Sequence, residues 1–182
     1  MTRDFTVDRN LSEQIVTFKM LPKESHGWRI AFYHIAKELW ELPEVYVILD
    51  KELYEQGKKI PVFREHKDLS GLQMFSSYSK ALSFVEKTDS MFVSNGKKLI
   101  GKIKTGAFQQ VFVPFFAEQR FVYILNENDA EFIDTFERLL KVMEAKENYV
   151  VDEEQEKLLV AKDIQGFFSD ICKKYIIEES GI

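Results

Sequence analysis

Short apolar runs and longer amphipathic stripes follow one another along this chain, with no long polar linker between them. Over residues 24–42, apolar side chains recur at three- and four-residue spacing, which predicts one buried stripe of an α-helix. Pro43 ends this helix, because proline cannot continue the helical hydrogen-bond ladder. The run 45–49 that follows is β-branched and aromatic, and it predicts a buried strand. The sequence therefore favours a fold in which helices pack on a sheet.

Two more strands and a helix are predicted after this unit. The runs 60–63 and 72–75 are short and apolar, and each follows a turn that contains a glycine. Either Ser76 or Ser77 would cap the next helix, because a serine hydroxyl accepts a hydrogen bond from an N–H in the first turn. The apolar stripe of that helix includes Ala81.

The segment around residues 97–105 has two interpretations. Asn95 and Gly96 are typical of a two-residue hairpin turn, because both residues tolerate a positive φ. Leu99 and Ile103 instead have the four-residue spacing of a short helix. We favour the helix and keep the hairpin as the alternative.

Residues 110–116 and 120–125 are rich in β-branched and aromatic side chains, and they predict an antiparallel hairpin. Side chains alternate between the faces of a strand, so Phe112, Pro114 and Phe116 would share one face. Because proline cannot donate to a central ladder, this strand would lie at an edge or a bulge. The more common outcome is that C-terminal helices cover this face. The alternative is that Phe112 and Phe116 form part of a homodimer or partner interface.

Helices are predicted over much of the range 129–177. Apolar residues recur at helical spacing over 132–143, and acids stand four residues ahead of bases on the outer side. A second helical stretch, 152–177, opens with acidic residues, which favour a helix N-terminus. Because strands and helices interleave without regular alternation, we predict one α+β domain over residues 1–182, with a mixed sheet and C-terminal helices.

Composition and charge narrow the classes of function. The formal net charge of -5 argues against general nucleic-acid binding, which depends on a basic surface. No run approaches the roughly 18 apolar residues of a membrane span, and acids stand where a signal peptide needs an apolar core. The single cysteine, Cys172, excludes an intramolecular disulfide and fits a reducing compartment. We therefore expect a cytoplasmic protein without a nucleic-acid or membrane partner.

The order of elements from about residue 40 to 125 is similar to that of a known family. The matching features are the strands 45–49 and 60–63, Asp68, Gly71 and the step 72–77 into a helix that contains Ala81. This pattern resembles the N-terminal domain of the SseB-like (enhanced serine sensitivity) family. The resemblance implies a cytoplasmic, non-catalytic bacterial protein with a regulatory role.

No catalytic, cofactor-binding or metal-binding residue is predicted. Cys172 stands in the middle of a predicted helix, where a structural thiol is the common outcome. His34 and Glu38 stand four residues apart on the first predicted helix, but no third metal ligand of suitable spacing follows. The string 101–108 has the two glycines of a phosphate loop and lacks the Lys-Ser/Thr pair that must follow the second.

Positive charge is concentrated in one stretch of this acidic chain. The four residues are Lys97, Lys98, Lys102 and Lys104. Such a cluster can dock an anion or an acidic partner. The more common alternative is a basic turn that only faces water.

The leading hypothesis is a non-enzymatic regulatory or protein-interaction domain whose protein partner is unknown. The alternative is an immunity protein or antitoxin that binds and blocks a toxin through an acidic and aromatic surface. The net charge and the 16 phenylalanines fit both. A third hypothesis, an enzyme with an unfamiliar site, requires a pocket with convergent titratable groups.

Overall fold

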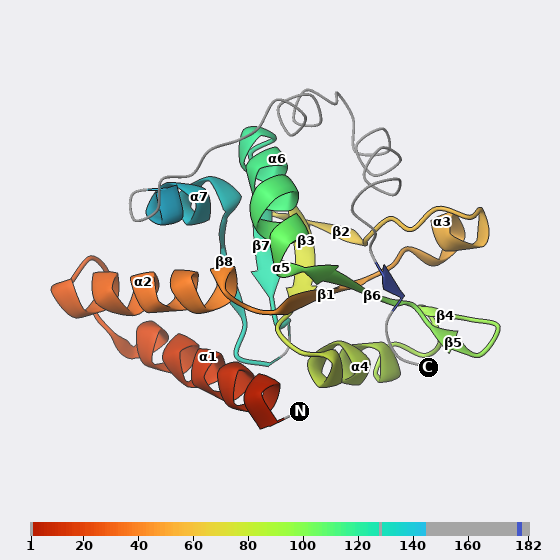
Figure 1. Ribbon diagram of the computed structural model, residues 1–182, viewed down its shortest axis with the longest axis horizontal. Helices are drawn as coiled ribbons and strands as arrows, with labels where there is room; N and C mark the ends of the chain where they lie inside the picture. The colour runs from red at the N-terminus through yellow and green to blue at the C-terminus, as the bar shows by residue number, and fades with distance from the viewer. Residues whose placement is uncertain (1, 128, 145–177, 180–182) are drawn as a thin grey trace.

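The computed structural model describes residues 2–127, 129–144 and 178–179 (Figure 1). The helical elements are α1 (Thr2–Met20), α2 (His26–Trp40), α3 (Lys51–Glu55), α4 (Tyr78–Glu86), α5 (Thr105–Ala107), the π-helix η1 (Phe108–Phe112), α6 (Val113–Glu118) and α7 (Phe136–Glu144). The strands are β1 (Glu44–Ile48), β2 (Phe63–His66), β3 (Leu69–Phe75), β4 (Val93–Ser94), β5 (Lys97–Lys98), β6 (Ile100–Lys104), β7 (Val122–Leu125), β8 (Phe132–Thr135) and β9 (Glu178–Glu179). The predicted helix 152–177 and Cys172 lie outside the described residues.

The main sheet is mixed. Its strands run in the order β8-β7-β3-β1-β6-β9, and β2 pairs with the first half of β3. β3 and β7 are parallel, whereas the other paired strands of this sheet are antiparallel. Together with the helices, this sheet confirms the predicted α+β class.

Helices cover both faces of the sheet (Figure 1). On one face, the ring of Tyr123 in β7 lies 5.3 Å from the ring of Phe136 in α7. On the other face, the ring of Phe75 in β3 lies 5.4 Å from the ring of Phe84 in α4. Nearly all buried apolar side chains of the described residues form one cluster, which includes residues of η1 and α6. These layers leave α1 and α2 together at one end of the molecule.

Side-chain caps explain where several helices begin. The hydroxyl of Ser77 accepts from the N–H of Lys80 at 3.3 Å, so the predicted cap of the helix after β3 is present. Ser25 caps α2 by accepting from the N–H of Trp28 at 3.2 Å. Asp50 caps the short helix α3 by accepting from the N–H of Leu53 at 2.9 Å. Local sequence therefore fixes these boundaries.

The prediction of a strand at 110–116 is wrong. These residues form η1 and α6, and residues 111–117 are all buried. A short, fully apolar run has the same composition in a buried strand and in a buried helix, so periodicity cannot distinguish them. Pro114 lies in the first turn of α6, directly after the π-helix η1 from which α6 continues. The predicted hairpin is therefore absent, and β7 instead pairs antiparallel with β8.

The helix favoured for 97–105 is also wrong, and the hairpin alternative is the one observed. Asn95 has φ 52° and Gly96 has φ 76°, which is the left-handed pair that a two-residue hairpin turn needs. This turn joins β4 to β5, and β6 follows directly. All five residues of β6 pair with β1, and this pairing stabilises a strand more than the helical spacing of Leu99 and Ile103 favours a helix.

Two other boundaries differ from the predictions. Residues 132–135 form β8, so the predicted helix over 132–143 begins only at Phe136. The strand predicted at 60–63 is displaced, since β2 spans Phe63–His66 and Pro61 makes only an isolated bridge to Leu49.

Candidate functional site

The first two helices form a pair that packs on the body of the protein through one stripe of α1. Leu11 and Ile15 in this stripe are fully buried. The ring of Phe18 lies 5.0 Å from that of Trp28 in α2 and 5.4 Å from that of Phe132 in β8. The spacing of these α1 residues is that of one helix face. Val16 and Met20 lie on α1 outside this stripe.

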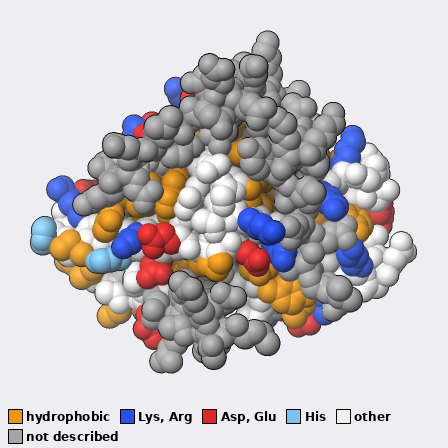
Figure 2. Space-filling model, viewed as in Figure 1, with side chains coloured by type: hydrophobic (Ala, Val, Ile, Leu, Met, Phe, Trp, Pro, Cys, Tyr) orange, Lys and Arg blue, Asp and Glu red, His pale blue; other side chains and the backbone are white. Residues whose placement is uncertain are grey.

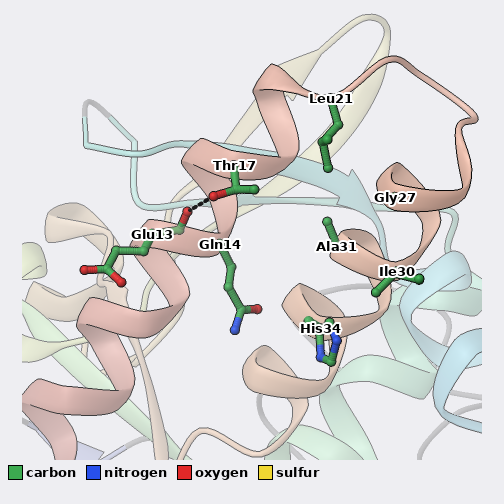
Figure 3. Close-up of a pocket in the computed structure, with 8 residues that line it drawn as sticks. All are labelled: Glu13, Gln14, Thr17, Leu21, Gly27, Ile30, Ala31 and His34. Atoms are coloured by element: carbon green, nitrogen blue, oxygen red, sulfur yellow. Dashed lines mark hydrogen bonds between the residues drawn. The ribbon is translucent and has the colours of Figure 1, made fainter.

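A groove lies between α1 and α2, with a volume of about 470 Å³ (Figure 3). Its lining residues are Glu13, Gln14, Thr17, Leu21, Gly27, Ile30, Ala31 and His34. Gly27 and Ala31 stand four residues apart on α2, so the smallest side chains of that helix face the groove. In Figure 3, Gln14 extends from α1 into the space between the helices. The hollow lies where α2 carries the small residues Gly27 and Ala31.

Exposed apolar side chains are concentrated on the two helices that form this groove. Among the residues whose side-chain burial the structure describes, five large hydrophobic side chains are exposed. Three of them belong to α1 or α2: Val16 (51%), Met20 (81%) and Ile30 (45%). Ile30 lines the groove, whereas Val16 and Met20 stand three residues after the lining residues Glu13 and Thr17. Figure 2 shows hydrophobic side chains beside histidines at this end of the molecule. The α1–α2 groove, meaning its eight lining residues, thus combines polar and apolar side chains, and exposed apolar side chains stand beside it on α1.

One polar atom in the groove lacks a hydrogen-bond partner. The side-chain oxygen Oε1 of Gln14 is shielded from solvent and accepts no hydrogen bond within the described part of the chain. A shielded amide oxygen without a donor costs about 1–3 kcal/mol. A bound molecule that supplies an N–H or O–H donor would recover this cost.

A second cluster of polar groups lies inside the body, between β7, β8 and α7. The hydroxyl of Tyr123 and the oxygen Oδ2 of Asp134 are buried without a partner among the described residues, and the two side chains are register neighbours on β7 and β8. Arg138 approaches the other carboxylate oxygen of Asp134 at 3.6 Å. Burial raises the pKa of Asp134, while the N–H of Thr135 and the charge of Arg138 oppose this shift. Burial, together with the Asp134 charge, also raises the pKa of Tyr123 well above its ordinary value.

We expect Asp134→Asn to stabilise the protein at neutral pH. The folded-state pKa of Asp134 is raised, so the folded protein binds more protons than the unfolded chain between the unfolded pKa, about 3.9, and the folded pKa. Stability is therefore lost as the pH rises through this window, and a neutral amide removes the loss. Urea unfolding from pH 4 to 8 should give a difference between wild type and variant that grows with pH. Asp68→Asn, at an exposed turn position, is the control, and an identical profile for both variants would contradict this account.

The four lysines of the predicted basic cluster lie on two neighbouring strands and point to different parts of the protein. Lys97 in β5 lies over the ring of Tyr54 in α3, with Nζ 5.9 Å from the ring centroid. Lys98 pairs with Glu86 of α4 at 3.2 Å, and Lys102 pairs with Glu44 of β1 at 3.6 Å. Lys104 is exposed and stands two residues after Lys102, so the two share one face of β6. The structure thus brings Lys102 and Lys104 together and separates them from the other two.

Phe112 and Phe116 are in the core. Both have 0% exposure, and their rings lie 6.2 Å apart. Phe116 stacks on Phe136 of α7 with ring centroids 5.3 Å apart. A helix from the range 129–177 therefore covers Phe116, as the first of the two interpretations predicts. Neither phenylalanine is presented on the surface of the described structure.

The other candidates are not brought together into a site. His34 lines the α1–α2 groove and is exposed. Within residues 2–127, 129–144 and 178–179, no group of three or more His, Cys, Asp or Glu side chains could hold a metal ion. Gly101 belongs to β6 and pairs with Val47, so the two glycines of 101–108 do not form a loop around a phosphate. No helix in the described part of the chain is long and apolar enough to cross a membrane.

Comparison with known proteins identifies no relative of this chain. No family model, no curated protein and no solved structure matches the chain. The α1–α2 groove is the surface that sequence reasoning missed. Its signal is the pair Val16 and Met20, four residues apart on α1 and outside the buried stripe.

Proposed function

We propose that this chain is a non-catalytic, cytoplasmic regulatory domain of the SseB-like type that binds a protein partner through the α1–α2 groove. The observation that carries the proposal is the presence of exposed Val16, Met20 and Ile30 on the two helices that form a groove, with Ile30 in its lining. Apolar side chains that cluster at the surface mark interaction sites more often than isolated ones do. The partner element is an amphipathic helix.

The shape of the surface supports a helix as the bound element. Two packed helices present a groove along their length, and a third helix can lay its i, i+3, i+4, i+7 stripe into such a groove. The small residues Gly27 and Ala31 leave room for one large apolar anchor of the partner. The unpaired oxygen of Gln14 favours a partner helix that also carries a hydrogen-bond donor beside this anchor.

The test compares groove variants with a matched surface variant. Ile30→Glu places a charge in the groove and Met20→Glu places one beside it, both at exposed positions, and Met91→Glu introduces a charge at a remote residue that is 62% exposed. Proteins captured from the native cells by wild type and each variant are quantified by mass spectrometry. The captured protein is then purified and titrated calorimetrically. We expect both groove variants to lose at least tenfold in affinity, corresponding to about 1.4 kcal/mol, and Met91→Glu to bind normally.

Two outcomes would overturn the groove as the binding site. One is equal affinity of the purified partner for Ile30→Glu and for Met91→Glu. The other is a captured partner that binds without any helical segment, which peptide mapping of the complex would reveal. The immunity hypothesis differs only in the partner: a captured protein that is toxic without this chain would assign the domain to that class.

A further inference from the structure

The α1–α2 groove contains one hydrogen-bond acceptor that the described part of the chain does not satisfy. Gln14 extends from α1 into the space between the helices, and its Oε1 is shielded from solvent without a donor (Figure 3). Thr17, three residues further along α1, has a hydroxyl that donates to the backbone carbonyl of Glu13 at 3.0 Å. Because a hydroxyl has one proton, Thr17 cannot also donate to Gln14. A donor from a bound molecule would complete this site.

Apolar side chains line the groove beside this acceptor. A Cβ placed on Gly27 would lie 3.7 Å from Cδ2 of Leu21, so the glycine leaves this face of Leu21 uncovered by α2. Ile30 and Ala31 stand on the next turn of α2. The groove volume of about 470 Å³ lies within the roughly 300–1,000 Å³ of sites that bind small organic groups. A flat ring with one polar edge therefore suits the groove.

One side chain matches a single unsatisfied acceptor beside apolar walls. The indole of tryptophan has one N–H donor, no acceptor and no charge, so its binding would leave no polar atom of the ring without a partner. Tyrosine brings acceptor lone pairs as well as its donor. Lysine and arginine bring several donors and a charge that is costly to remove from water. Tryptophan is also one of the residues that most often anchor protein interfaces.

We infer that the partner helix is anchored in the α1–α2 groove by a tryptophan, whose indole N–H donates to Oε1 of Gln14. This inference rests on the proposed function, because it names the side chain through which the proposed partner binds. The large anchor and the hydrogen-bond donor of the partner are then the same residue. Its ring packs against Leu21 and Ile30, where Gly27 and Ala31 leave room.

The test uses indole and benzothiophene as probes, since the two rings have similar shape and only indole has an N–H. Each probe is titrated into the isotope-labelled full-length protein, and the shifts of backbone amide signals give the dissociation constant and the residues around the probe. We expect indole to shift amides within residues 13–34 and to bind at least about threefold more tightly than benzothiophene. Gln14→Met keeps the length of the side chain and removes the acceptor, so it should bind the two probes equally.

Matched variants control for indirect effects. Gln56→Met is the same replacement at an exposed residue directly after α3, and it should keep the wild-type preference for indole. His34→Ala should also keep this preference, because the acceptor remains. Gly27→Ala adds a methyl group whose nearest described neighbour, Cδ2 of Leu21, lies at ordinary contact distance, so the fold should tolerate it. This methyl narrows the groove, and both probes should bind more weakly. Unchanged amide signals of the sheet, without probe, show that each variant is folded.

Three probe results would overturn the inference and leave the groove proposal standing. They are equal affinity of wild type for indole and benzothiophene, a preference for indole that persists in Gln14→Met, and tighter binding of benzamidine, which would make the anchor a cation. A captured partner whose bound segment contains no tryptophan would also overturn it.

Failure of the proposed function has a different signature. In that case Ile30→Glu binds the captured partner normally, while wild type still prefers indole through Gln14. This outcome would overturn the tryptophan anchor too, and it would assign the groove to a free indole-like molecule.

Discussion

Phe116→Ala is expected to lower the free energy of unfolding by about 3–5 kcal/mol, the usual cost of removing a buried phenylalanine ring. Its side chain has 0% exposure and contacts rings from several elements. The centroid distances are 5.1 Å to Phe121, 5.2 Å to Phe115, 5.3 Å to Phe136 and 5.9 Å to Phe63. The ring joins α6 to β2 and α7, so the cavity left by alanine cannot close by the movement of one side chain.

Urea unfolding and sizing chromatography check this expectation together. Met91→Ala, at a side chain that is 62% exposed, is the control and should change stability by no more than about 0.5 kcal/mol. Phe116→Leu keeps most of the volume and should cost less than the alanine variant. A stable Phe116→Ala monomer that has lost self-association would contradict the core assignment and restore the interface hypothesis.

Asn126→Ala is expected to cost about 2–4 kcal/mol, because it removes buried hydrogen bonds and keeps a strained backbone angle. Asn126 has 0% exposure and lies directly after β7 with φ 55°. Its Oδ1 accepts from the N–H of Ser76 at 2.9 Å, and its Nδ2 donates to the hydroxyl of Ser76 at 2.9 Å. These bonds hold the ends of β3 and β7 together where α4 begins.

Asn126→Gly separates the two causes. Glycine adopts φ 55° without strain, so this variant loses only the side-chain hydrogen bonds. Chemical denaturation gives the free energy of unfolding of each variant. The difference between the alanine and glycine variants should therefore equal the cost of the strained backbone angle, about 1 kcal/mol. If both variants unfold at the wild-type urea concentration, Ser76 does not depend on Asn126.

The parts of the fold that sequence reasoning predicted are those where local signals agree. α2 ends before Pro43, β1 follows at once, and β3 leads into α4 at the serine cap. Each of these boundaries depends on neighbouring residues only: a proline, a β-branched run or a capping hydroxyl. The mixed sheet follows from the irregular order of such elements.

The parts that were missed depend on contacts between distant residues. Residues 108–118 are as apolar as a strand, but they are helical and pack against β2 and α7. Residues 132–135 have helical spacing, but β7 pairs with them as a strand. For the candidate sites, the sequence shows that Lys102 and Lys104 are basic, but not that an acidic strand pairs beside them. The α1–α2 groove needs the relative position of two helices, which no local pattern contains.

The parallel pairing of β3 and β7 sets a condition on how this chain reaches its native state. These adjacent strands are separated in sequence by residues 76–121, which include α4, β6, η1 and α6. The entropy of closing such a long loop is lost before the contacts between the strands repay it. We therefore expect β7 to join the sheet late, after much of the intervening chain has folded against β3 and β1. Until then one side of β3 is an unpaired strand, and this is the stage at which the chain is most exposed to aggregation.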